Sequence, residues 1–378
     1  MLKRTLYILG ALAVLAGLYG FYARLFIGER DVNYGSYVTW GLWVAMYLFF
    51  AGVATGAFML ATLDHLFNVK LFQGTGKYAL WGALVTMPAA LITIGFDLGH
   101  MERIWKVYLQ PNFSSLLAQL VWGYTIFTLV IVLALWLTAR QRTSLAVKIV
   151  MAIGLFLAVF LSGGVGALLG VNASRPAWHV GMLPAQFPVF SLTSGIALML
   201  ILVGWLIPAD GRRAQQLRFL GLAAIVLLVV KAYYLWTDYS LALYTGTPEA
   251  SQAVNLVLFG RYGWAFWGLQ LGLGMVLPLI VLIQPRYGQS GLWAGMMGVA
   301  ILIGFAVARA NIIFPALAIP ELEGLLTAFS GPHLNFDYTP SLMEWSVVAG
   351  VVGLATLAYL LGTDRLPLFK RSTAEMTK

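Results

Sequence analysis

Apolar residues run through this chain in long stretches that short polar segments interrupt. A helix needs about 20 mainly apolar residues to cross the hydrocarbon core of a membrane, and ten stretches meet that length. They cover roughly residues 5–27, 38–66, 77–97, 116–139, 146–170, 187–208, 216–237, 262–284, 291–313 and 341–362. The connecting segments are too short for a soluble domain. We therefore expect one all-α integral membrane domain over residues 1–378, with about ten transmembrane helices.

Composition supports this interpretation. Hydrophobic residues make up 61% of the 378 positions and charged residues 10%, with a mean hydropathy of +0.86. A soluble domain is about 45–50% apolar and about 25% charged. The composition excludes a water-soluble enzyme, a disordered chain and a nucleic-acid-binding domain. Because the chain has no cysteine, it can hold neither disulfides nor thiolate-bound zinc or iron–sulfur clusters.

Lysine and arginine predict the orientation. With the N-terminus inside, fifteen basic residues fall on the inner side and six on the outer side, while Lys231 and Arg309 lie within spans. An excess of basic residues marks cytoplasmic loops, so both termini are predicted to be cytoplasmic. We expect a multi-pass protein of the bacterial or archaeal cytoplasmic (inner) membrane.

The outer connectors are longer than the inner ones and carry aromatic residues. They cover residues 98–115, 171–186, 238–261 and 314–340, and include Trp105, Tyr108, Trp178, Tyr239, Tyr244 and Phe336. One interpretation is an aromatic belt at the membrane interface. The other is a docking surface for an extracytoplasmic partner.

Asp97 closes the third span, and His100, Glu102 and Arg103 follow it. Positions 97 and 100 would share a helix face if the helix continued that far. A carboxylate beside an imidazole is suited to accepting and releasing protons. The alternative is an ordinary helix end with an ion pair to Arg103.

Four further charged residues lie within spans or at their ends, where charge is costly. They are Lys231, Asp238, Arg309 and Glu344. Lys231 and Asp238 are seven residues apart, two turns along one helix face, and could pair with each other or with Glu344. They form either a structural ion-pair network or part of a proton path.

The histidines argue against an integral haem relay. All four (His65, His100, His179 and His333) lie at span ends or in loops, whereas a membrane cytochrome holds each haem between two histidines inside the bundle. A role in electron transfer would therefore need a diffusible organic carrier. Tyr47, buried in the second span, has a hydroxyl that could bond a quinone carbonyl.

Several motifs now become recognisable. The stretch WVAMYLFFAGVATG at residues 43–56 resembles the first core helix of the NrfD/PsrC-type family, the membrane subunit of polysulfide reductase and its relatives. Asp97-Leu98-Gly99 is similar to the family's Asp-Leu-Gly element. The loop QPNFSS at 110–115, the segment NASRPAW at 172–178 followed by Leu183-Pro184, and Phe266-Trp267 with Pro278 also resemble family segments. The resemblance covers nearly the whole chain.

The resemblance implies two four-helix bundles, residues 38–170 on the quinone side and residues 187–313. A helix and loop at 1–37 and a helix at 341–362 would be added at the ends. It also implies a haem-free subunit that binds quinone near the outer face and docks an iron–sulfur subunit linked to a molybdopterin or other catalytic subunit. Asp97, Arg175 and Trp178 match the family motifs. The chain departs from them at Tyr47, Gly164 and Gln270, where relatives carry His, Tyr and Glu.

We therefore predict a haem-free anchor subunit of a respiratory oxidoreductase, with menaquinone or ubiquinone as substrate and no metal in this chain. The candidate quinone-binding residues are Tyr47, Asp97, His100, Arg103, Ser115 and Trp178. The candidate docking residues are Trp105, Asn112, Arg175 and His179, and the candidate proton path is Lys231, Asp238, Arg309 and Glu344. The alternatives are a secondary transporter with a polar site at the bilayer midplane and a purely structural anchor.

Overall fold

The computed structural model describes residues 2–141, 144–244, 247–322, 324–329 and 331–369. In these ranges ten helices are long and apolar enough to cross a membrane. They are Leu2–Ile27, Leu42–His65, Gly76–Asp97, Leu116–Arg140, Leu145–Gly170, Leu183–Leu206, Arg213–Tyr244, Ala265–Ile283, Gly291–Leu317 and Leu342–Arg365. Each corresponds to one predicted span, so the all-α membrane fold is confirmed. Four residues counted in the inner basic set, Arg142, Lys370, Arg371 and Lys378, lie outside the described residues.

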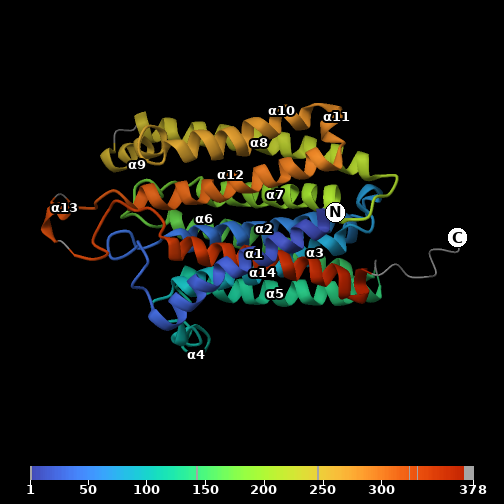
Figure 1. The fold of residues 1–378 in the computed structure, drawn as a ribbon, viewed down its shortest axis with the longest axis horizontal. Helices are drawn as coiled ribbons and strands as arrows, with labels where there is room; N and C mark the ends of the chain where they lie inside the picture. The colour runs from blue at the N-terminus through green and yellow to red at the C-terminus, as the bar shows by residue number, and fades with distance from the viewer. Residues whose placement is uncertain (1, 142–143, 245–246, 323, 330, 370–378) are drawn as a thin grey trace.

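The membrane-spanning helices lie side by side along one common direction, and successive helices run antiparallel (Figure 1). In chain order they are α1 (Leu2–Tyr22) with η1 (Ala23–Ile27), α2 (Leu42–His65), α3 (Gly76–Asp97), α5 (Leu116–Arg140), α6 (Leu145–Gly170), α7 (Leu183–Ile201) with η4 (Leu202–Leu206), α8 (Arg213–Tyr244), η5 (Ala265–Val276) with α10 (Leu277–Ile283), α12 (Gly291–Leu317) and α14 (Leu342–Arg365). Short helices α4 (Lys106–Leu109), α9 (Pro248–Leu258), α11 (Pro285–Gly288) and α13 (Leu325–Ala328) lie between them. We call the end that carries α9 and α13 the loop end, and the opposite end, which carries Leu2 and Arg365, the terminal end.

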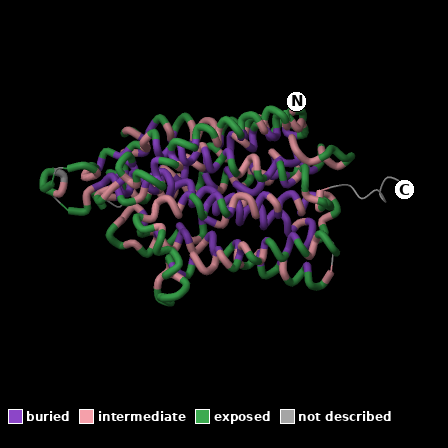
Figure 2. The backbone as a smooth tube through the Cα atoms, turned by 60° about the horizontal axis from the view of Figure 1, so that its bottom comes forward, coloured by how far each residue is buried: buried purple, intermediate pink, exposed green. Residues whose placement is uncertain are grey.

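Helix α2 lies at the centre of the bundle. Its membrane-spanning window is fully buried, and it packs against α3, α6 and α7. Figure 2 shows the buried residues concentrated in the middle of the molecule and the exposed ones on the outer helices. A helix that is apolar on every face is stable only inside such a shell of neighbours. Residues 43–56, which carry the resemblance, therefore form the core of the fold.

The first and last helices lie side by side. Gly17 of α1 packs against Gly350 of α14, and the backbone N–H of Gly20 donates to Ser346 Oγ over 2.9 Å. Lys3 and Asp364 form an ion pair at the terminal end. The pair packs against α3, so the two added helices of the prediction form one flank. The division into bundles 38–170 and 187–313 stays a prediction, because α2 also packs closely against α7.

The closest approach of α2 and α7 depends on glycine. A Cβ at Gly56 would overlap the backbone of Ser191 and Gly195, and a Cβ at Gly195 would overlap Gly56. Small residues at such positions let transmembrane helices pack backbone to backbone.

We expect Gly56→Leu to destabilise the fold by more than the about 1–3 kcal/mol typical of overpacking, since rigid backbone rather than a mobile side chain blocks the new atoms. The yield of monodisperse protein in detergent measures this effect. Gly95→Leu is the matched control, because a Cβ there meets no heavy atom of the described residues within 4 Å. Equal yields for the two variants would contradict the assigned helix crossing.

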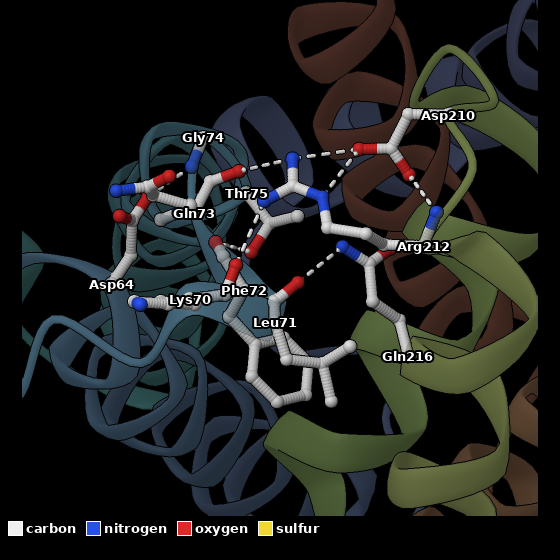
Figure 3. A network of polar contacts seen from close by, with 11 residues as sticks. Asp64, Lys70, Leu71, Phe72, Gln73, Gly74, Thr75, Asp210, Arg212 and Gln216 are labelled. Atoms are coloured by element: carbon white, nitrogen blue, oxygen red, sulfur yellow. Dashed lines mark hydrogen bonds and ion pairs between the residues drawn. The ribbon is translucent and has the colours of Figure 1, made fainter.

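At the terminal end, the α7–α8 loop holds the α2–α3 loop (Figure 3). Arg212 pairs with Asp210 and donates to the carbonyl oxygens of Lys70 and Gln73 at 2.7 and 3.0 Å. Gln216 Nε2 donates to Leu71 O over 2.7 Å. A short basic connector predicted for this end thus binds the backbone of a neighbouring loop.

Two elements differ from the predicted boundaries. α8 continues to Tyr244, so Asp238 belongs to the helix and not to a loop. Much of the predicted 238–261 loop is helical, since α9 follows. η5 is a π-helix of 12 residues around Gln270. Such wide turns in membrane-spanning segments are frequent at functional sites.

Candidate functional site

A cluster of polar residues lies at the loop end of α3. α3 ends at Asp97, and Arg24 of η1 donates to the carbonyl oxygens of Phe96 and Leu98 at 2.6 and 2.7 Å. Arg24 also pairs with Glu29 at 2.8 Å. The guanidinium thus satisfies carbonyl groups that a helix end leaves unpaired. Sequence reasoning assigned Arg24 no role beyond its charge.

Asp97 belongs to the same cluster of polar residues. Its Oδ1 is buried without a hydrogen-bond partner among the described residues, as is the hydroxyl of Tyr34. Asp97 interacts electrostatically with Arg24, Glu29 and Glu344. Burial, then the Asp97 carboxylate, raises the pKa of Tyr34, so this phenol stays protonated. The structure therefore places at this end a buried acid oxygen and a buried, protonated phenol, neither of which has a hydrogen-bond partner among the described residues.

Glu344 belongs to the same end of the molecule but is fully hydrogen-bonded. It forms a capping box with Ser341, and its carboxylate accepts from the backbone N–H groups of Asn33, Leu42 and Ser341 at 3.2, 3.3 and 2.9 Å. Tyr338 also donates to it. Glu344 therefore holds two loops over the start of α2. It pairs with neither Lys231 nor Asp238 among the described contacts.

The predicted Asp97–His100 helix face is wrong, because α3 ends at Asp97 and Leu98 is extended. His100 lies in an exposed turn, with Nδ1 3.0 Å from Glu102 Oε1, and Arg103 Nε lies 3.4 Å from the same oxygen. Hydrogen bonds from its own backbone and from His100 lower the pKa of Glu102. The alternative ion pair of Asp97 with Arg103 is not formed either.

Two other predicted residues serve local structure. Ser115 caps α5, its Oγ accepting from Ala118 N over 3.3 Å. Asn112 Oδ1 accepts from Ser114 N over 3.1 Å. Both residues therefore stabilise the turn that leads into α5.

Tyr47 is a buried residue of α2 and faces Tyr124 of α5. Its ring lies 6.1 Å from that of Tyr124, and the two hydroxyls share a hydrogen bond. Tyr124 in turn interacts electrostatically with Arg309 of α12. The Arg309 guanidinium lies 4.0 Å from the Phe187 ring centroid. Tyr47 thus belongs to a closed polar contact inside the bundle.

A cavity of about 540 Å³ lies among α7, α8, η5 and α12 and is covered at the loop end by α9 and the 173–183 loop. Of the predicted residues, Trp178, His179, Lys231 and Asp238 line it. Volumes of about 300–1,000 Å³ with few polar groups are typical of small-molecule sites. The cavity is lined by residues between 173 and 316, and not by the bundle of residues 38–170 that was predicted as the quinone side.

Four polar side chains of this cavity form two hydrogen-bonded pairs, and the Lys231 amine is a further polar group. Gln186 Nε2 donates to Asp238 Oδ2 over 2.7 Å, and Asn311 Nδ2 donates to Gln270 Oε1 over 2.7 Å. Lys231 Nζ is buried and has no hydrogen-bond partner in the described part of the chain. It lies 3.5 Å from the Phe305 ring centroid. The expected pairing of Lys231 with Asp238 does not occur.

Sequence reasoning gave no role to Gln186 and Asn311. Asn311 is a polar residue within an otherwise apolar span, and that is the signal that could have identified it, whereas Gln186 falls in the predicted 171–186 connector. Gln270 was noted only as a departure from the family. Each of these amides has its partner on another helix, which the sequence does not reveal.

The 172–178 motif packs inward. Trp178 Nε1 donates to Ile312 O over 2.6 Å, and its ring stacks on Trp40 at 5.5 Å. Arg175 donates to Ile319 O over 2.8 Å and pairs with Glu321 at 2.9 Å. Burial lowers the pKa of Arg175, and Glu321 acts in the opposite direction. Trp178 therefore touches the cavity on one side and the start of α2 on the other.

Comparison with known proteins identifies the family. A family model described as "Polysulphide reductase, NrfD" matches residues 32–321. A selenate reductase subunit from Mesobacillus selenatarsenatis is 30% identical over 98% of this chain and 96% of its own length. The Hdr-like menaquinol oxidoreductase integral membrane subunit of Archaeoglobus fulgidus is 26% identical over 94% and 92%. A polysulfide reductase subunit from Wolinella succinogenes is 25% identical over 73% and 94%. The chain therefore belongs to the polysulphide reductase NrfD family of multi-span membrane proteins.

Proposed function

We propose that this chain is the quinone-binding membrane anchor of a respiratory oxidoreductase. It would exchange electrons between the quinone pool and an iron–sulfur subunit at the loop end, while a further subunit holds the catalytic centre for the other substrate. Family membership supports an anchor in a redox complex, and one relative is named as a menaquinol oxidoreductase subunit. The loop end is predicted to be extracytoplasmic.

The cavity is the observation that carries the quinone proposal. Its wall is largely apolar, as a lipid-soluble ring requires, and Trp178, Tyr239 and Phe190 supply aromatic surface. Lys231 offers an unpaired donor to a quinone carbonyl, and Asp238 offers an acceptor to a hydroxyl of the quinol form. The residues present therefore fit a quinone.

Two-electron quinone chemistry needs two protons. We assign proton exchange to two groups, Asp238 in the cavity and Asp97 at the end of α3. Lys231 and Arg309 lie 5.5 and 5.4 Å from the Phe190 ring centroid and remain a proposed proton path. Glu344 leaves that path, since its oxygens are occupied by backbone and tyrosine donors.

This proposal changes the predicted quinone contacts. Trp178 is retained as a wall of the site. Tyr47 is not proposed as a direct quinone contact, because it interacts with Tyr124. His100, Arg103 and Ser115 are not proposed either, because they lie in the 98–115 segment and not at the cavity. Partner docking is proposed for the loop around Arg175 and His179.

Photoaffinity labelling tests the function. We expect a photoreactive naphthoquinone to label peptides covering 173–190 and 231–242 in the purified complex, and unlabelled menaquinone to compete with it. Peptides covering 43–56 serve as the internal control for labelling near Tyr47. If these peptides are not labelled, or if menaquinone does not compete with the label, the result would favour a transporter or a structural anchor. Purification of the chain with no redox partner would favour the same alternatives.

A further inference from the structure

The segment between α3 and α5 folds back along the side of the bundle. The hydroxyl of Tyr108 lies 2.7 Å from Thr125 Oγ1, and Trp122 Nε1 donates to Val107 O over 3.0 Å. Thr125 is the tenth residue of α5, about 14 Å along the axis from its first residue. Figure 1 shows α4 beside the loop-end half of α5 and set back from α13. The segment therefore lies at a depth that the membrane spans occupy.

This segment exposes large apolar side chains. Trp105, Leu109 and Phe113 are 50%, 73% and 74% exposed. Apolar surface gathered in so short a stretch is unusual on a face that contacts water. A cover of low polarity is needed over the exposed apolar side chains of this segment.

The charged residues of this segment indicate what covers its apolar side chains. Arg103 and Lys106 alternate with the aromatic residues, and Glu102, the acid of the segment, is engaged by His100 and Arg103. Tryptophan and tyrosine beside basic residues are typical of the membrane interface. The basic groups favour phosphate-bearing headgroups, because nearby cations gain energy at an anionic lipid surface.

We propose that residues 98–115 form an interfacial lipid-binding anchor, in which Trp105, Leu109 and Phe113 enter the acyl boundary while Arg103 and Lys106 contact lipid phosphates. A soluble partner that approaches from the loop end meets α9 and α13 before this side face. Trp105 therefore serves the bilayer and not the docking of a subunit. The inference does not depend on quinone binding.

Spin labelling tests the placement, because a chain without cysteine accepts a label at one chosen site. We would label Leu109→Cys and the matched control Leu322→Cys, which is 68% exposed near α13. The full chain is placed in nanodiscs of phosphatidylcholine and phosphatidylglycerol. We expect a several-fold higher ratio of oxygen to nickel-chelate collisions at 109 than at 322. Equal ratios would place the segment in water and overturn the proposal in favour of a protein partner.

A second measurement tests the phosphate contacts. In discs that contain phosphatidylglycerol, the double variant Arg103→Gln with Lys106→Gln should lower the ratio of oxygen to nickel-chelate collisions at position 109. Inorganic phosphate added to the unsubstituted chain should not lower this ratio, and phosphate added to the double variant should not restore it. Lys148→Gln, at an exposed lysine of α6 near the terminal end, is the control for loss of charge. An unchanged collision ratio in the double variant would remove Arg103 and Lys106 from the lipid contact.

Discussion

Replacing Lys231 with methionine is expected to weaken quinol-dependent electron transfer by roughly ten- to a hundredfold while the chain still folds. The estimate follows from the about 1.5–3 kcal/mol contributed by a hydrogen bond to a charged group. Lys231 Nζ lies in the wall of the cavity and has no hydrogen-bond partner in the described ranges, so a ligand oxygen would be its partner. Methionine keeps the length of the side chain and removes the donor. The KM for quinol in the purified complex measures the loss.

A structural role for Lys231 predicts the opposite outcome. Removing a buried charge that lacks a partner often stabilises a protein. If the lysine only filled space, Lys231→Met would raise thermal stability in detergent and leave turnover unchanged. Lys148→Met, on the exposed face of α6, is the matched control, and its KM should equal that of the unmodified chain.

The spans could be predicted from the sequence because each is a long apolar run between polar connectors. Helix ends were harder to predict. At the end of α3, the residues Gly95 to His100 offer no proline and no capping side chain, so the sequence left open whether the helix reached His100. The structure ends it at Asp97, where Arg24 takes the free carbonyl groups. That contact joins residues more than seventy positions apart.

The cavity could not be predicted for a related reason. Its hydrogen-bonded pairs join Gln186 to Asp238 and Gln270 to Asn311, and each pair bridges two helices. Hydropathy shows that a polar residue lies in a span but not which helix face it occupies or what faces it. Lys231 and Asp238 were found as costly charges within or beside spans, yet the amide that binds Asp238 depends on how α7 packs against α8.

Asp97→Asn should lower quinol-coupled turnover, by less than the about hundred- to ten-thousandfold contribution of an acid or base that contacts the reacting group, because Asp97 does not line the cavity. Asparagine has nearly the same shape but cannot take up or release a proton. Asp97 Oδ1 is buried, with no hydrogen bond among the described residues, so the substitution breaks no contact that holds the fold together. Turnover of the purified complex, normalised to assembled subunits, measures the effect.

The matched control is Asp31→Asn, because Asp31 lies in the exposed loop between η1 and α2 at the same end of the molecule. Both substitutions replace an acid with an amide at the loop end, so a general effect on docking would reduce turnover in both. A specific proton-exchange role predicts a loss for Asp97 alone, with equal amounts of co-purified partner in the two variants. Tyr34→Phe should then reduce turnover less, since burial keeps this phenol protonated and its hydroxyl has no hydrogen-bond partner among the described residues. Normal turnover in Asp97→Asn would limit proton exchange to Asp238 and the cavity.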